Sequence, residues 1–263
     1  MRNIEIFKKH LREKRAVKID CGMDNFDLEL IKKVALSAQE ALASAIDVPA
    51  SKDVIKVAKE NTRLTIFASS IHPFKLLEAV KAGADAIEIG NYESLYKEGT
   101  FLSANDVYEI AMEVIDLTKK FNPYICVTIP AHLDITEQVE LAKKLELIGV
   151  DLIQTESYAR KEAVHIKGSA DSAKTSIMNT MEISENIGIP VMTSSGLSPQ
   201  TVPLAFVSGA QAVSIDACVT KMDTKVGMVA IIRNIVGSIA FNRQASQELK
   251  NESIKMEFSS PYL

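Results

Sequence analysis

The apolar and polar positions of this chain repeat a short pattern three times. Each copy begins with a glycine and continues with apolar side chains at every second position. The copies cover residues 83–90, 149–156 and 209–216, so their starts lie 66 and 60 residues apart. A glycine can adopt the left-handed conformation that ends a helix, and the alternation after it is typical of a buried strand. The spacing fits two strand–helix units, which predicts a barrel of eight alternating strands and helices.

The same reading extends to the rest of the chain. Strands are predicted over residues 16–20, 43–48, 63–69, 86–90, 124–129, 152–156, 190–194 and 212–216. Helices are predicted over residues 27–42, 51–60, 73–81, 103–121, 136–148, 172–187, 199–208 and 223–249. A short helix within residues 3–14 is expected outside the barrel or under its bottom. We therefore predict an α/β fold, a single (β/α)₈ TIM barrel over residues 16–263 with an N-terminal helical extension over residues 1–15.

The alternation also predicts which side chains line the barrel, because residues two apart share one face of a strand and the face on the helices must be apolar. The neutral inward residues include Phe67, Cys126, Thr128, Met192 and Ser194. The charged inward residues are Lys18, Asp20, Asp47, Glu88, Glu156 and Asp216. A barrel interior that serves only stability is filled with branched apolar residues, so this polar lining favours a functional site.

Five inward carboxylates repel one another, which predicts that at least one has a raised pKa and acts as a general acid or base. Alternatively, a divalent cation such as Mg²⁺ binds between the carboxylates and neutralises their repulsion. Lys18 is either a counter-ion for Asp20, Glu88 or Asp216, or a Schiff-base nucleophile. The catalytic candidates are accordingly Lys18, Asp20, Asp47, Glu88 and Glu156, together with one histidine described next.

Loops after the strands carry further candidates. His72, His132 and His165 follow the third, fifth and sixth strands, and His132 is the candidate acid or base near pH 7. The turn at Ser194, Ser195 and Gly196, with Lys221 nearby, is a candidate anion site, which a phosphate or a flavin would occupy. Residues 157–171 form a long connection, which is either a solvated loop or a lid that closes over an anionic ligand.

Composition narrows the classes of partner. The formal net charge of −4 and the absence of a dense basic run argue against a nucleic-acid surface. No apolar run approaches the 18 residues that a membrane span needs, and the first residues lack the features of a signal or transit peptide. Three cysteines without a Cys-x-x-Cys pair indicate neither a disulfide framework nor a zinc site.

Three segments carry a resemblance to the aldolase-type, phosphate-binding barrel superfamily, namely residues 83–90, 193–198 and 209–216. Over nearly its whole length the chain also resembles the family of hypothetical chloroplast reading frame twenty-three. The carrying segments are residues 18–22 with 25–26, residues 45–49 and 84–92, residues 154–156 with Gly168, and residues 191–198. This resemblance implies a chloroplast or cyanobacterial location and a barrel fold, and it names no reaction. Asp216 departs from the phosphate pattern of the superfamily, where glycine and serine are expected.

We therefore expect an enzyme of lyase or isomerase type that acts on a small anionic metabolite by proton transfer or with a metal. The alternative is a non-catalytic barrel that binds a ligand and acts through a protein partner. We expect neither a nucleic acid nor a membrane as partner. The sequence leaves the oligomeric state, the substrate and the choice between a metal, a flavin and no cofactor open.

Overall fold

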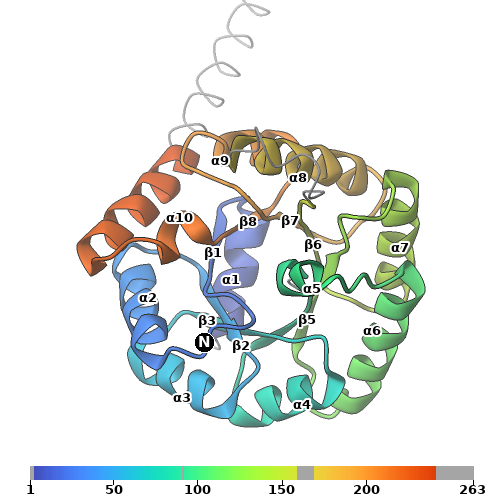
Figure 1. Cartoon of the computed structure of the whole chain (residues 1–263), viewed down its shortest axis with the longest axis horizontal. Coiled ribbons are helices and arrows are strands. Elements are labelled where there is room, and N and C mark those ends of the chain that lie inside the picture. Colours follow the sequence, from blue (N-terminus) through green and yellow to red (C-terminus); the bar gives the residue numbers. More distant parts are fainter. Residues whose placement is uncertain (1–2, 91, 159–168, 241–263) are drawn as a thin grey trace, which may run out of the picture.

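The chain forms a closed barrel of eight parallel strands surrounded by helices (Figure 1). The computed structural model describes residues 3–90, 92–158 and 169–240. The strands follow one another around the barrel in chain order, and β8 pairs with β1 to close it. The predicted (β/α)₈ fold is confirmed. Within the described ranges, no helix is long and apolar enough to cross a membrane.

All eight predicted strands are present, with ends that differ from the prediction by at most two residues. They are β1 (Ala16–Asp20), β2 (Ala45–Pro49), β3 (Thr65–Ser69), β4 (Ala86–Ile89), β5 (Tyr124–Ile129), β6 (Leu152–Thr155), β7 (Val191–Thr193) and β8 (Ala212–Ile215). Each strand residue is buried, because the side chains of one face lie inside the barrel and those of the other lie under the helices.

The helices also follow the prediction, with two main differences. They are α1 (Asn3–Arg12), α2 (Leu28–Glu40), α3 (Lys52–Asn61), α4 (Pro73–Ala82), α5 (Glu93–Glu98), α6 (Ala104–Thr118), α7 (Ile135–Leu147), α8 (Ser169–Ser184), α9 (Val202–Val207) and α10 (Ala217–Thr220). Residues 225–240 form a further helix, whose predicted extension to residue 249 lies outside the described residues. The short helices α5 and α10 were not predicted, and α9 begins three residues late because Pro203 suits the first turn of a helix.

The glycines of the threefold repeat do what the sequence predicted. Gly83, Gly149 and Gly209 have φ angles of 98°, 93° and 104°, which is the left-handed region that residues with a Cβ rarely adopt. Each ends one helix and turns the chain into the next strand. The repeat therefore reflects three equivalent helix-to-strand turns of the barrel.

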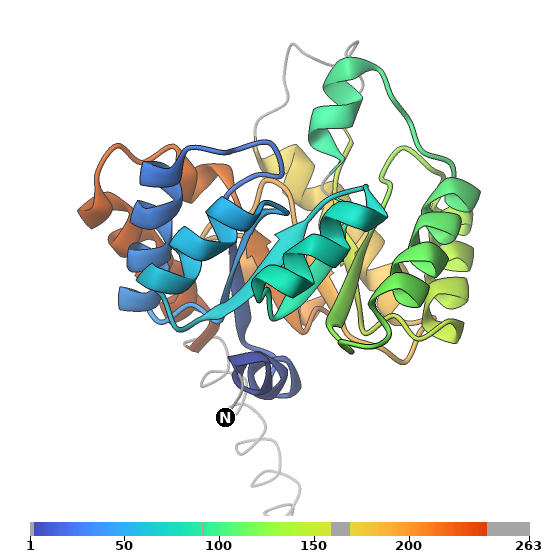
Figure 2. The same cartoon turned by 90° about the horizontal axis from the view of Figure 1, so that it is seen from below.

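Helix α1 lies under the barrel and closes its lower end (Figure 2). Its Phe7 is completely buried, and the ring centroid lies 5.0 Å from that of Phe67 and 6.2 Å from that of Tyr124. The backbone carbonyl of Asn3 also accepts a hydrogen bond from the Thr65 hydroxyl at 2.8 Å. Of the two positions expected for this helix, the structure shows the one under the barrel.

The barrel interior therefore has an apolar lower half and a polar upper half. The lower half is one cluster of buried side chains from α1 and from the strands, and the predicted inward residues Phe67, Cys126 and Met192 belong to it. The polar side chains lie above it, toward the carboxyl ends of the strands. The fold thus confines the chemistry-bearing residues to the upper end, where active sites of this fold occur.

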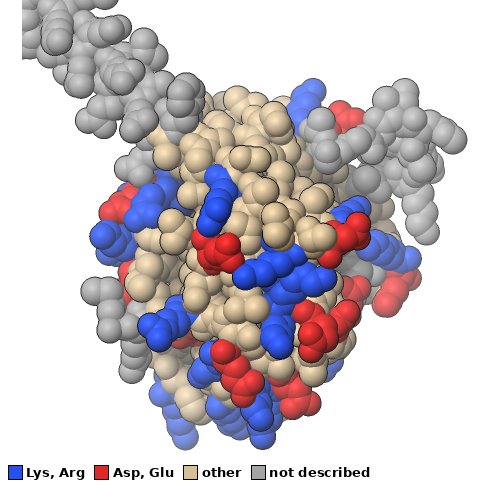
Figure 3. Space-filling model, turned by 90° about the vertical axis from the view of Figure 1, so that its left-hand side faces the viewer, with Lys and Arg blue, Asp and Glu red and all other residues tan. Residues whose placement is uncertain are grey.

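The outer surface carries both signs of charge. On the side formed by α2 and the helix over residues 225–240, basic and acidic side chains are interspersed (Figure 3). Glu40 there pairs with Lys225 at 2.7 Å and with Arg233 at 3.8 Å. Such exposed pairs contribute little to stability, so this side is an ordinary solvated surface.

Replacing Phe7 by alanine tests whether α1 is part of the barrel core. Phe7→Ala is expected to lower the free energy of unfolding by about 3 kcal/mol, because the substitution removes a fully buried ring. Ile6→Ala on the same helix is the matched control, because Ile6 is 42% exposed. Urea denaturation measures both, and an equal, small effect of the two variants would show that α1 does not close the barrel.

Candidate active site

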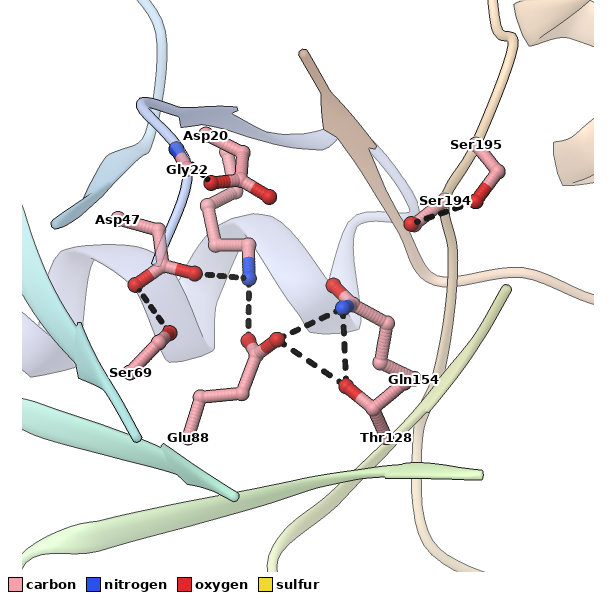
Figure 4. A network of polar contacts seen from close by, with 10 residues as sticks. Asp20, Gly22, Asp47, Ser69, Glu88, Thr128, Gln154, Ser194 and Ser195 are labelled. Atoms are coloured by element: carbon pink, nitrogen blue, oxygen red, sulfur yellow. Dashed lines mark hydrogen bonds and ion pairs between the residues drawn. The ribbon is translucent and has the colours of Figure 1, made fainter. Parts of the chain in front are cut away.

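A lysine ammonium lies between two carboxylates inside the barrel, and dashed lines in Figure 4 mark its contacts with Asp47 and Glu88. Lys18 Nζ donates to Asp47 Oδ2 at 3.0 Å and also pairs with Glu88 Oε2. The exposed fractions of Lys18, Asp47 and Glu88 are 0%, 1% and 0%. The same ammonium lies 5.2 Å from the ring centroid of Phe67, at the top of the apolar lower half. The three charged groups are therefore held in a place that water does not reach.

Neutral side chains satisfy the remaining carboxylate oxygens. Ser69 Oγ donates to Asp47 Oδ1 at 2.6 Å, and Thr128 Oγ1 donates to Glu88 Oε1 at 3.1 Å. Gln154 Nε2 donates to the same Glu88 oxygen at 2.7 Å. A buried ion cluster persists only when such hydrogen bonds complete it. We call Lys18, Asp47, Glu88, Ser69, Thr128 and Gln154 the interior network.

Strand register explains how residues far apart in the chain meet here. Asp20 lies beside Asp47, Ser69 beside Glu88 and Thr128 beside Gln154 in neighbouring strands. All have the inward parity that alternation predicts. Gly90, which follows β4, has a φ of 140°, and a Cβ there would lie 2.3 Å from Thr128 Cβ. A glycine is therefore required for the backbone to pass this close to the network.

The charges of the interior network depend on one another. Burial alone lowers the pKa of Lys18, but Asp47 and Glu88 more than offset this, so the pKa lies above its ordinary value and the side chain is an ammonium. Burial raises the pKa of Glu88, and Lys18 offsets only part of that rise. Of the two roles left open for Lys18, this geometry is that of the counter-ion. Its partners are Glu88, as expected, and Asp47 in place of Asp20 or Asp216.

Asp20 lies at the end of β1, beside the network and nearer the mouth, with 6% of its surface exposed. Its Oδ1 accepts a hydrogen bond from the Gly22 backbone N–H at 2.7 Å. Burial and the neighbouring Asp47 carboxylate raise the pKa of Asp20 well above its ordinary value. It is the carboxyl group of this set that is best placed to exchange a proton with a molecule in the mouth.

A magnesium site at the interior network does not fit the donor set. Divalent cations need several oxygen ligands around one point, and the Lys18 ammonium fills that point between Asp47 and Glu88. No group of three or more His, Cys, Asp or Glu residues in the described ranges is arranged to hold a metal ion.

Glu156 forms a separate acidic site farther around the mouth. Tyr96 Oη donates to Glu156 Oε1 at 2.6 Å, and the same phenol lies 3.4 Å from His132 Nδ1. Burial raises the pKa of Glu156 to about 8, although the hydrogen bond from Tyr96 acts in the opposite direction. Burial also lowers the pKa of His132, so its imidazole is neutral at pH 7. The structure therefore groups His132 with Glu156 and not with Lys18.

The residue that joins these two groups, Tyr96, was not among the predicted site residues. It belongs to α5, where sequence reasoning expected only a loop. Its ring packs on Phe101 and Tyr158, with centroid distances of 5.6 Å and 4.9 Å, and on His132 at 5.6 Å. The aromatic residues between β4 and α6 were the available signal, because solvated loops seldom carry them so densely. This aromatic cluster fixes α5 above the mouth.

The candidate anion site follows β7, beside the end of β6. Ser195 and Gly196 have φ angles of 70° and 67°, and Ser195 Oγ accepts a hydrogen bond from the Ser157 backbone N–H at 3.2 Å. Ser194 Oγ lies 3.5 Å from Ser195 Oγ. Among the described residues, no hydrogen bond engages the backbone N–H groups of Ser195, Gly196 and Leu197. The turn thus presents consecutive donors, as an anion site requires.

The other predicted residues are less close to the network. Lys221 is exposed at the end of α10, and no contact in the described ranges joins it to the Ser195–Gly196 turn. His165 and most of the long sixth connection lie outside the described residues. Two buried polar atoms, Gln154 Oε1 and Ser214 Oγ, have no hydrogen-bond partner in the described part of the chain. Gln154 Oε1 points toward the space between Asp20 and Ser194 (Figure 4).

A closed barrel of eight parallel strands and surrounding helices, with polar residues at the carboxyl ends of the strands, defines a TIM barrel. The chain belongs to the family described as "Protein of unknown function (DUF561)", whose model matches residues 1–245. Relatives named "Uncharacterized protein ycf23" include those of Porphyra purpurea, 32% identical over 91% of this chain and 90% of the relative, and of Cyanidium caldarium, 35% identical over 86% and 90%. These relatives come from algal plastid genomes. The expected family is confirmed.

Solved structures share the barrel at low sequence identity. One is 3-hexulose-6-phosphate synthase from Salmonella typhimurium, with a TM-score of 0.61, 15% identity and coverage of 86% of this chain and 99% of that one. Another is (S)-3-O-geranylgeranylglyceryl phosphate synthase from Thermoplasma acidophilum in complex with sn-glycerol-1-phosphate, with a TM-score of 0.58, 16% identity and coverage of 89% and 98%. These likenesses show the fold.

Removing the ammonium tests the energetic coupling of the interior network. Lys18→Met is expected to lower the free energy of unfolding by about 3 to 5 kcal/mol, because Asp47 and Glu88 would be left as unpaired buried charges. Adding Asp47→Asn and Glu88→Gln to the same protein is expected to restore most of this loss. Urea denaturation measures both. No recovery in the triple variant would mean that the loss comes from packing and not from charge.

The raised pKa of Glu156 predicts how stability depends on pH. Between its ordinary value of 4.5 and about 8, the folded protein holds a proton that the unfolded chain has released. The free energy of unfolding therefore falls as pH rises through this window, by up to about 1.4 kcal/mol per pH unit. Glu156→Gln removes this dependence. The free energy of unfolding of the variant should therefore rise relative to that of the wild type from pH 5 to pH 8. Parallel stability curves would contradict the raised pKa.

Proposed function

We propose that the protein is an enzyme that transfers a proton on a small anionic metabolite, in a lyase or isomerase reaction. The observation that carries the proposal is the buried Lys18 ammonium between Asp47 and Glu88, with Asp20 beside it at the mouth. Stability alone does not favour such a cluster, because apolar residues of similar volume serve as well or better. A cluster that holds a neighbouring acid in a protonated form has a use in catalysis.

In this proposal Asp20 exchanges the proton and the interior network sets its pKa. Burial and the Asp47 carboxylate disfavour the charged form of Asp20, while Lys18 favours it, and together they hold the pKa of Asp20 well above its ordinary value. Lys18, Asp47 and Glu88 are positioning residues, because they are closed off from the mouth. Glu156 and His132 offer a second acid–base pair in a different environment. Two titratable groups with separated environments are the usual basis for assigning an acid and a base.

The substrate's anionic group is proposed to lie on the turn at Ser194, Ser195 and Gly196. Three consecutive backbone N–H groups there are not engaged by described residues. Similar solved structures include proteins whose names contain phosphate esters, such as 3-hexulose-6-phosphate synthase. This agrees with a phosphate or carboxylate on the substrate. Because the relatives come from algal plastids, we propose the chloroplast stroma or the cyanobacterial cytoplasm as the place of action.

Hydrogen exchange at carbon tests this proposal even while the substrate is unidentified. The protein is incubated in D₂O with pools of phosphorylated and carboxylated metabolites, and loss of C–H signals is followed by proton NMR. The wild type is expected to exchange or convert at least one compound. Asp20→Asn should slow this by about 100-fold, because it removes the proton-transferring group and leaves Lys18 paired. Lys81→Ala, on the outside of α4, is the control and should behave as wild type.

Two results would contradict the proposal. Exchange by Asp20→Asn at the wild-type rate would remove Asp20 from the chemistry. No exchange or conversion by the wild type in any pool would favour the alternative, a barrel that binds a ligand without transforming it and acts through a protein partner.

A further inference from the structure

A cleft of about 500 Å³ opens at the mouth on the side of β2 and β3. It lies between the loop after β1, the starts of α3 and α4, and the end of α5. In the barrel order β3 is four strands away from β7 (Figure 1). The residues that line the cleft and the turn after β7 therefore lie on opposite sides of the mouth. Its volume is that of a site for a small molecule.

Charged side chains of both signs line this cleft. Lys75 comes from the first turn of α4, Asp24 from the loop after β1 and Glu98 from the last residue of α5. In the described ranges, no ion pair or side-chain hydrogen bond engages any of the three. They lie on different elements around one cavity, so a molecule that carries both charges can pair with all three. A simple anion would be repelled by the two carboxylates.

The cleft also has an apolar wall, to which Phe26, Ile71 and Leu95 contribute. Phe26 is 58% exposed, although large aromatic rings are usually buried in a folded chain. An apolar group in the cleft would cover part of this ring and lower the cost of its exposure to water. The lining therefore suits a ligand with an apolar body as well as charges of both signs.

The two helices that start at the cleft determine its polarity. Ser51 and His72, the N-cap residues of the ten-residue helices α3 and α4, line the cleft, so the positive ends of both helices lie beside it. Neither residue makes a side-chain cap hydrogen bond. Lys75 adds a full positive charge there. A carboxylate is favoured at this end of the cleft, and an ammonium is favoured toward Asp24 and Glu98.

We propose that the β2–β3 cleft binds a zwitterionic, amino-acid-like molecule with an apolar side chain. Its carboxylate pairs with Lys75 at the start of α4, its ammonium faces Asp24 and Glu98, and its side chain packs on Phe26. This site goes beyond the proton-transfer function and does not depend on it. Ser69 lies at the floor of the cleft and donates to Asp47, so the occupant lies one hydrogen bond from the interior network.

Three matched probes test the proposal by calorimetric titration of the full chain. L-leucine carries both charges, 4-methylpentanoate lacks the ammonium and 3-methylbutylamine lacks the carboxylate. Leucine is expected to bind, and each truncated probe should bind about fivefold more weakly or worse, since each loses one ion pair. Phe26→Ala should weaken all probes alike, because it removes the shared apolar contact.

Lys75→Ala separates the charge contact from binding elsewhere on the protein. It is expected to weaken leucine about fivefold and to leave leucine no better a ligand than 3-methylbutylamine. Lys81→Ala at the other end of the same helix, where the lysine pairs with Glu78 at 2.7 Å, should bind leucine as the wild type does.

The proposal is overturned if leucine does not bind, if either truncated probe binds as tightly as leucine, or if Lys75→Ala binds leucine unchanged. Both lysines are exposed, so neither variant threatens the fold. None of these results bears on the Asp20 exchange experiment. Failure of that experiment would likewise leave the proposal of a ligand site in the cleft unchanged.

Discussion

The confinement of one ammonium group between two carboxylates is the constraint on which the upper half of this barrel depends. Lys18, Asp47 and Glu88 come from three different strands and leave almost no surface to water. Loss of Lys18 would leave two buried carboxylates without a counter-charge, which costs more than most single contacts contribute. The surrounding residues are arranged to prevent this, with Ser69, Thr128 and Gln154 completing the carboxylates and Gly90 giving Thr128 the room that it needs.

The same constraint separates the chemistry of the mouth into two environments. Next to the network, Asp20 is influenced by Asp47 and Lys18, whose charges act in opposite directions on its pKa. Farther around the mouth, Glu156 is governed mainly by burial under α5 and by the phenol of Tyr96. Burial raises the pKa of both carboxyl groups, and different neighbours then adjust it, namely the Asp47 and Lys18 charges at Asp20 and the Tyr96 hydrogen bond at Glu156. These different surroundings are the condition for assigning the two groups different roles.

Sequence alone predicted the strands and the inward parity, because both follow from the period-two alternation and from the three glycines of the repeat, each of which ends a helix. It therefore placed Lys18, Asp20, Asp47 and Glu88 inside the barrel. It could not predict that Asp47 is the second partner of Lys18. Which inward residue of a neighbouring strand lies closest to Lys18 depends on the stagger between the strands, and the alternation does not determine that stagger. It also missed α5 and Tyr96, since a six-residue helix has no reliable periodicity, and Tyr96 joins Glu156 to His132 through tertiary contacts.

The charge state of Lys18 is the most direct test of this account. Carbon-13 NMR of the lysine Cε resonances follows each side chain as the pH is raised toward 11. The account predicts that the Lys18 signal shows no titration step over this range, because the two carboxylates raise the pKa of Lys18 above its ordinary value. A Lys18 resonance that titrates with the exposed lysines, or below them, would show that the carboxylates do not hold an ammonium there and would contradict the central claim.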